Sequence, residues 1–193
     1  MKKIIILLTL VCSLVGCVLP AVLIAGATGA TLGGSVIYDQ RTYQTMKQDH
    51  NAHSIIQYQL DNNSLLKRNS HISISVFNNI ALLVGQAKTP KIRDYSYQTV
   101  QKASAYIRRI YNEITIGVPL SPVQQAFDSW ITTKIRVAML GKIGLHSSNL
   151  KVVTENKVVY LMGIVSPKQA AMAADVARRI SGVKKVIKVF EYE

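Results

Sequence analysis

An internal repeat constrains the fold of this chain more than any other feature of its sequence. Residues 72–85 align with residues 150–163: in both segments apolar residues alternate with polar ones, a polar turn follows, and a second apolar run ends in glycine. This pattern is typical of a β-hairpin. The predicted turns are Asn78-Asn79 and Glu155-Asn156-Lys157, and the glycines are Gly85 and Gly163. Because the pattern occurs twice, we expect two similar folding units.

A helix and a last strand follow each hairpin. Thr89-Pro90 and Ser166-Pro167 each place a capping hydroxyl before a proline at the first helical position. Each unit also has an amphipathic helix before its hairpin and a short closing strand. The helices are expected at residues 53–60 and 128–140, and the strands at residues 113–116 and 186–190. Each unit therefore has the order α-β-β-α-β.

This order predicts an α+β fold for each unit. The right-handed rule for β-α-β crossovers places the two helices on one face of a three-stranded mixed sheet. We expect the first domain at residues 49–117, a linker at residues 118–125 and the second domain at residues 126–193. A single core is marginal in a unit of about 70 residues, so packing between the units, or on a membrane, would help.

The first sixteen residues have the layout of a secretory signal peptide. Two lysines precede an apolar run at residues 4–11, which is too short to span a bilayer, and Gly16 stands before Cys17. Leu-Val-Gly-Cys resembles the lipobox of bacterial lipoproteins, which implies cleavage before Cys17 and acylation of its thiol. Since Cys12 leaves with the signal, Cys17 has no disulfide partner, and acylation accounts for it. The alternative is an ordinary signal peptide with a chance cysteine.

Residues 18–36 are small and apolar, and they allow two interpretations. One is a transmembrane helix. The other is a flexible or membrane-surface tether, which Pro20 and several glycines favour because they destabilise helices. We therefore predict a lipidated flexible tether at residues 17–48.

The chain is strongly basic, with a net charge of +13 that falls only to about +11 without Lys2 and Lys3. Basic proteins commonly bind nucleic acid or anionic membranes. Export argues against nucleic acid, so an anionic membrane is the predicted partner. A solvated basic surface without a partner is the alternative.

Several short segments resemble one family closely. They are Tyr111–Gly117, Trp130–Lys134, Thr154–Asn156, Leu161–Gly163 and Ile180–Lys184. With the element order and the glycine after each second strand, they resemble the BON domain family, and most closely its dual-BON outer-membrane lipoproteins. The resemblance implies a lipoprotein anchored in the outer membrane on its periplasmic face, which supports envelope integrity without catalysis. Val18 fits, because it is not the aspartate that retains lipoproteins at the inner membrane.

The resemblance also implies that the second BON domain binds anionic phospholipid, chiefly through its first helix. That helix carries two apolar stripes at helical spacing. The first stripe consists of Phe127, Ile131, Ile135 and Ala138, and the second of Trp130, Val137 and Leu140. We expect the first stripe to pack on the sheet, which leaves the second stripe for another surface.

Cations border the second stripe, as an anionic interface requires. The predicted phospholipid-binding residues are Trp130, Thr133, Lys134, Arg136, Val137 and Leu140. A phosphatidylglycerol-like membrane is the expected ligand, and tryptophan suits the depth of the headgroups. Two alternatives remain open: Trp130 fills the joint between the domains, and Lys134 and Arg136 lie on a solvated helix face.

Other notable residues have structural interpretations. We expect Gly85 and Gly163 to serve folding, through positive φ or a close helix approach, and not ligand binding. Arg108-Arg109 and Arg178-Arg179 are expected in the last turns of helices, where cations offset the helix dipole.

The sequence offers no catalytic, metal or cofactor site. His50 and His53 have helical spacing, but no cysteine or carboxylate cluster joins them. The acidic residues are scattered, so no carboxylate pair is predicted for acid–base catalysis. A non-enzymatic alternative to lipid binding is an adaptor that docks envelope proteins, with the acyl anchor serving only for location.

Overall fold

The computed structural model describes residues 39–103 and 105–193. The predicted signal peptide, the acylation site at Cys17 and residues 18–38 of the tether lie outside the described residues. The first domain consists of α2 (Tyr43–Asn62), α3 (Ser64–Asn69), β1 (Ser70–Phe77), β2 (Ile80–Ala87), α4 (Pro90–Ala103) and β3 (Arg109–Ile116). The second consists of α5 (Pro122–Leu140), η1 (Ser147–Asn149), β4 (Leu150–Glu155), β5 (Val158–Val165), α6 (Pro167–Arg178) and β6 (Lys185–Tyr192).

Each domain has one three-stranded mixed sheet, with the order β1-β2-β3 or β4-β5-β6. The first two strands of each sheet pair antiparallel, and the second and third pair parallel. Two residues with positive φ connect each hairpin, as in the turns that match the twist of paired strands. These residues are Asn78 and Asn79 (φ 50° and 60°) and Asn156 and Lys157 (φ 49° and 65°). The predicted α+β fold of two tandem units is confirmed.

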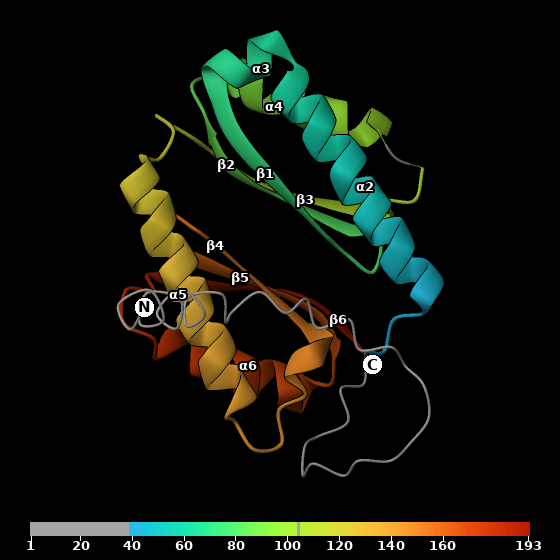
Figure 1. The fold of residues 1–193 in the computed structure, drawn as a ribbon, viewed down its shortest axis with the longest axis vertical. Helices are drawn as coiled ribbons and strands as arrows, with labels where there is room; N and C mark the ends of the chain where they lie inside the picture. The colour runs from blue at the N-terminus through green and yellow to red at the C-terminus, as the bar shows by residue number, and fades with distance from the viewer. Residues whose placement is uncertain (1–38, 104) are drawn as a thin grey trace, which may run out of the picture. The chain divides into compact units, whose positions relative to one another are not determined.

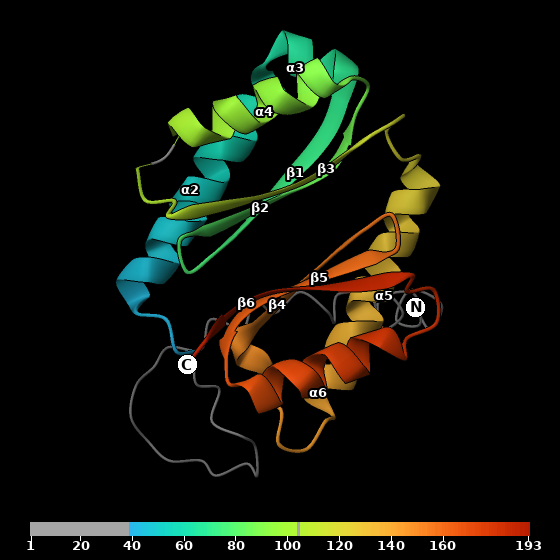
Figure 2. The ribbon, with the colours of Figure 1, turned by 180° about the vertical axis from the view of Figure 1, so that it is seen from behind.

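In each domain the helices cover one face of the sheet and enclose a core (Figures 1 and 2). Ile56, Leu83 and Val100 are fully buried in the first core. Ile131 and Leu161 are fully buried in the second. The apolar spacing of the helices therefore marks the side that meets the sheet.

The other faces of the two sheets form a third apolar cluster with each other. It contains Phe77, Ile80, Leu82 and Val84 from the first domain and Tyr160, Met162 and Val189 from the second. From Ile80 to Val84 the side chains of β2 alternate between its own core and this cluster, which is why this part of the strand is apolar at every position. Each small domain therefore buries both faces of its sheet.

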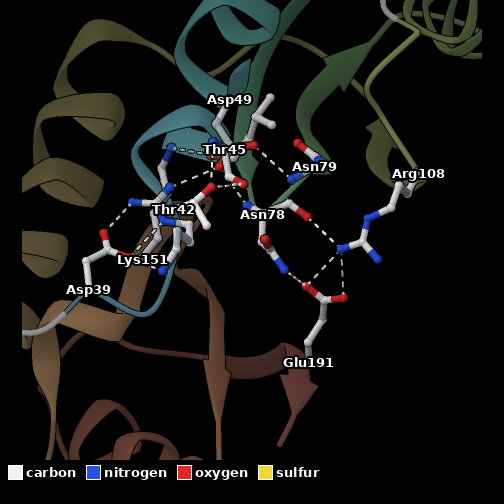
Figure 3. A network of polar contacts seen from close by, with 11 residues as sticks. Asp39, Thr42, Thr45, Asp49, Asn78, Asn79, Arg108, Lys151 and Glu191 are labelled. Atoms are coloured by element: carbon white, nitrogen blue, oxygen red, sulfur yellow. Dashed lines mark hydrogen bonds and ion pairs between the residues drawn. The ribbon is translucent and has the colours of Figure 1, made fainter. Parts of the chain in front are cut away.

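Polar contacts surround this apolar cluster. The amide of Gln86 donates to the carboxylate of Glu155 at 2.7 Å, and Lys151 Nζ donates to the backbone oxygen of Val76 at 3.1 Å. Figure 3 shows Glu191 of the second domain beside Arg108, with which it forms an ion pair at 3.1 Å. These directional contacts fix how the two sheets face each other.

A buried carboxylate on α2 holds the first hairpin. Asp49 accepts hydrogen bonds from the backbone N–H groups of Asn78 and Asn79, at 2.7 and 2.8 Å. Arg41 pairs with the same carboxylate at 3.0 Å. Figure 3 shows Asp49 beside Asn78 and Asn79. Asp49 is only 4% exposed, so its charge is satisfied almost entirely by protein groups. The contact ties the first helix to the turn.

Helix boundaries differ from the sequence prediction in both domains. The helix predicted at residues 53–60 is part of α2, which begins at Tyr43 inside the predicted tether because the Thr42 hydroxyl caps Thr45 N–H. The polar residues of its first turns are typical of a tether, which is why the sequence predicts one there. Similarly, α5 begins at Pro122 inside the predicted linker, after a capping box formed by Ser121 and Gln124. The short helix α3 was not predicted.

The last turn of α4 does not contain the arginine pair predicted there. The helix ends at Ala103, and Arg109 is the first residue of β3, opposite Ile80 of β2. Because β3 pairs with the whole of β2, the chain must leave the helix before these arginines. Arg178 does lie in the last turn of α6, as expected.

Gly85 and Gly163 lie within the central strands and not after them. Gly85 has a φ of +126°, and a Cβ there would overlap the backbone oxygen of His71. A Cβ on Gly163 would overlap the backbone oxygen of Asn149. The close approach is thus to the backbone of the neighbouring segment and not to a helix, and the expected structural role holds for both positions.

We predict that Gly163→Ala lowers the free energy of unfolding by about 1–3 kcal/mol, because the added carbon forces the chain at Asn149 away from β5. Gly117→Ala is the matched control, since a Cβ there would meet nothing within 4 Å. Chemical denaturation of both variants measures this difference. Equal stability of the two would contradict the close-packing role.

Burial raises the pKa of Glu155 from 4.5, although its hydrogen bond from Gln86 acts in the opposite direction. The folded protein therefore binds this proton more tightly than the unfolded chain. As pH rises from 4.5 through the folded-state pKa, the carboxylate must ionise in a partly buried position, and the free energy of unfolding falls.

Glu155→Gln keeps an oxygen that accepts from Gln86 but cannot ionise. We expect the free energy of unfolding of this variant to increase relative to the unmodified protein as pH rises through that range. Denaturation curves between acidic and neutral pH test this, and a constant difference would refute it.

Candidate functional site

The helix α5 begins and ends at strong local signals. The hydroxyl of Ser121 accepts from the backbone of Gln124, whose side chain accepts from Ser121 N–H, and Pro122 occupies the first turn. The helix ends at Leu140, with Gly141 as its C-cap. These signals set the nineteen-residue length of the helix.

One side of α5 packs on its own sheet. Ile131, Ile135 and Met139 are buried in the second core. The sequence prediction of this stripe was wrong at its two ends: Phe127 is 37% exposed, and Met139 takes the place given to Ala138. The reason is that Asp128, and not Phe127, turns toward the hairpin.

Asp128 fixes the rotation of α5. Its carboxylate accepts from the backbone N–H groups of Asn156 and Lys157, at 2.7 and 2.9 Å. Asp49 makes the same pair of contacts in the first domain. Neither residue was predicted from the sequence. Asp49 stands 29 positions before Asn78 and Asp128 stands 28 positions before Asn156, so the two repeats share this spacing almost unchanged.

The opposite side of α5 exposes apolar side chains to solvent. Their exposed fractions are 51% for Trp130, 63% for Val137 and 75% for Leu140, and Ile143 just beyond the helix is 95% exposed. The prediction that this stripe would lie outside the core is confirmed. Large apolar groups gathered on one exposed face mark an interaction surface.

Trp130 does not fill the joint between the domains, so that alternative is wrong. Its ring lies 5.4 Å from the ring of Phe127, and Lys134 Nζ lies 3.3 Å above its centre. Lys134 also donates to the backbone oxygen of Ser181 at 2.9 Å. The cation holds the indole ring at the surface by a cation–π contact.

The remaining predicted residues lie at the margins of this face. Arg136 is exposed and donates to the backbone oxygen of Val152 at 3.3 Å. Thr133 is exposed, and its hydroxyl donates to the backbone oxygen of Ser129 within the helix. Lys134 and Arg136 are two positions apart, about 200° around the helix, and therefore flank the apolar face on opposite sides. We call Trp130, Val137 and Leu140, with their flanking cations Lys134 and Arg136, the outer face of α5.

Two other kinds of site are absent from the part of the chain that the structure describes. No helix there is long and apolar enough to cross a membrane. No group of three or more histidine, cysteine or acidic side chains is placed there to hold a metal ion.

The BON domain model matches residues 48–118 and residues 127–193, one match in each structural repeat. The chain belongs to the BON domain family. The matches cover most of the described residues and include α5 from residue 127 onward, so the outer face of α5 belongs to the second BON domain.

Two relatives match the chain over most of its length. The chain is 34% identical to "Outer membrane lipoprotein DolP" of Haemophilus influenzae over 192 residues, which cover 100% of this chain and 96% of that protein. It is 37% identical to "21 kDa hemolysin" of Actinobacillus pleuropneumoniae, over 80% of this chain and 79% of that protein. The solved C-terminal domain of CdsD from Chlamydia trachomatis is 16% identical and gives a TM-score of 0.31, covering 74% of this chain and 65% of that one.

The full-length match to DolP confirms the predicted localisation. The protein is a dual-BON lipoprotein of the outer membrane with a role in the cell envelope. Acylation of Cys17 itself lies outside the described residues and stays a prediction, as does lipid contact at α5.

We predict that Asp128→Asn lowers the free energy of unfolding by about 2–3 kcal/mol, because a buried amide cannot accept both turn N–H groups as a carboxylate does. The matched control is Asp175→Asn, which removes a carboxylate that pairs with arginines on the surface. We expect little change there in the midpoint of urea denaturation. Similar losses in both variants would show that Asp128 has no special role.

Proposed function

We propose that this protein is anchored by Cys17 on the periplasmic side of the outer membrane and binds anionic phospholipid through the outer face of α5. Its role in the envelope would then depend on binding the phospholipid that surrounds its own acyl anchor. The observation that carries the proposal is the exposure of Trp130, Val137 and Leu140 directly opposite the buried side of the helix.

The apolar part of the outer face suits the boundary between headgroups and acyl chains. Its three side chains are half or more exposed, so each has apolar surface left to bury. Complete burial of such a side chain stabilises by about 1.5–3 kcal/mol, and partial insertion of all three gives a fraction of that sum. Tryptophan is favoured at this depth, because its ring is apolar and its N–H is polar.

The flanking cations supply a preference for anionic lipid. Neither Lys134 nor Arg136 forms an ion pair with another described residue; their contacts are to backbone oxygens and to the Trp130 ring. Both charges therefore remain available to phosphates. Each basic group close to an anionic surface adds about 1 kcal/mol at physiological ionic strength. Apolar insertion and charge together give a reversible contact that supplements the acyl chains.

The direct test is flotation of the compact unit formed by residues 36–193 with phosphatidylglycerol vesicles. This unit retains Asp39 and Arg41, which pair with each other. We expect it to float with the vesicles, and Trp130→Glu to abolish flotation, because a carboxylate would enter the apolar boundary beside anionic headgroups.

The matched control is Tyr58→Glu, which places the same charge on an exposed aromatic position of α2, 69% exposed in the first domain. This variant should float as the unmodified unit does, and phosphatidylcholine vesicles should bind less of either. Equal flotation of Trp130→Glu and Tyr58→Glu would overturn the proposal. If no vesicle is bound while cross-linking in cells captures one stoichiometric protein at α5, the face is a protein-docking surface instead.

A further inference from the structure

The second BON domain contains a cavity of about 700 Å³ between α6 and the edge strand β6. Figure 2 shows these two elements side by side, and Lys142 just after α5 also lines the cavity. Pockets of this size accommodate small ligands. No residue of the outer face of α5 lines this cavity, so the function proposed for α5 does not account for it.

The lining combines an apolar floor with a cationic rim. Five basic residues line it, namely Lys142, Arg178, Lys184, Lys185 and Lys188, and the floor includes Met172, Ala174 and Val186. The acidic residue in the lining is Asp175. The cavity is therefore strongly positive and suits a ligand with an anionic group and a short apolar part.

Asp175 does not neutralise the lysines of the rim. Its carboxylate pairs with Arg179 and Arg178, and these hydrogen bonds hold its pKa below the usual range. None of the four rim lysines forms an ion pair with a residue that the structure describes. Four positive charges are thus left around the cavity for a ligand.

Lys188 is an exposed cation on β6, between two residues of the helix-covered core. On β6 the side chains of Val186 and Phe190 belong to the helix-covered core, and those of Ile187 and Val189 to the cluster between the sheets. Lys188 lies on the helix-covered side, paired in register with buried Leu161. A charged side chain at this position is unfavourable in an apolar core, but it can bind an anionic ligand in the cavity.

The first BON domain shows that the fold does not require the cavity residues. Ala174 is the seventh residue after Pro167 of α6, and the seventh after Pro90 of α4 is Tyr97, which packs against the first core. In register, the counterpart of Lys188 is Asn112, which is paired with Leu83. The second domain thus has a small side chain and a cation where its twin has a large ring and a neutral amide.

We propose that this cavity binds the phosphate of an anionic phospholipid headgroup, with the rim lysines at the phosphate and the apolar floor beneath the adjoining carbons. The choice of a membrane lipid rests on the function proposed above for α5. Lys142 follows Leu140 of the outer face by two residues, so the cavity borders the surface that would meet the membrane. Lysine is a common phosphate ligand, acting as a point charge.

The test uses the full acylated protein in an uncharged detergent and a water-soluble probe, glycerophosphoglycerol, whose phosphorus NMR line broadens on binding. We expect Lys188→Asn to weaken binding about fivefold, since one cation near a phosphate is lost. Ala174→Tyr should abolish it by placing a ring over the apolar floor of the cavity, with a side chain that the twin domain already holds at this position. Lys188→Arg should retain binding.

Two controls separate this proposal from the function of α5. Lys102→Asn removes one charge from an exposed position of α4 and should leave probe binding unchanged. Trp130→Glu should lose vesicle flotation yet still broaden the probe signal. If Trp130→Glu binds vesicles normally while the cavity variants lose the probe, the α5 proposal fails and the phosphate site stands.

Three results would overturn the cavity proposal. The first is full probe binding by both Lys188→Asn and Ala174→Tyr. The second is loss of probe binding in Trp130→Glu, which would place the headgroup at the outer face. The third is inorganic phosphate binding as tightly as glycerophosphoglycerol and surviving Ala174→Tyr, which would mean free phosphate at the rim and no lipid headgroup in the cavity.

Discussion

A buried carboxylate on the first helix of each domain positions much of what surrounds it. Asp49 and Asp128 each accept two backbone N–H groups from a turn in which both residues have positive φ. Both carboxylates are almost fully buried, and the two N–H groups compensate much of the cost of burying each charge. The contact therefore stabilises the strained turn and the charge together. It also fixes the rotation of the helix against the sheet.

For α5 this rotation decides which side chains meet solvent. With Asp128 turned to the hairpin, Ile131 and Ile135 face the core, and Trp130 and Val137 face outward. The sheets use their remaining faces to pack on each other, which leaves the helices outermost. A membrane-binding helix needs both conditions: a fixed rotation, and no neighbouring domain over its apolar side. The structure of the described residues meets both.

Local patterns in the sequence were sufficient for the hairpins, the capping prolines of α4 and α6, and the exposed stripe at Trp130, Val137 and Leu140. They failed where a contact with a residue far away in the sequence determines the structure. Polar residues at the start of α2 look like a tether because the partners of Asp49 lie about thirty positions away. Met139 displaced Ala138 from the core because Asp128 sets the helix rotation. The cavity beside Lys188 was not predictable either, since it depends on Ala174 of another element.

The central claim is that the outer face of α5 enters an anionic membrane, and Trp130 can report on it directly because it is the only tryptophan in the chain. The decisive measurement is its fluorescence, with residues 36–193 added to phosphatidylglycerol vesicles that carry brominated acyl chains. The account predicts a blue shift of the emission and strong quenching by bromines near the headgroups, both weaker at high salt. An emission spectrum that stays unshifted and unquenched while the protein is bound to the vesicles would contradict it.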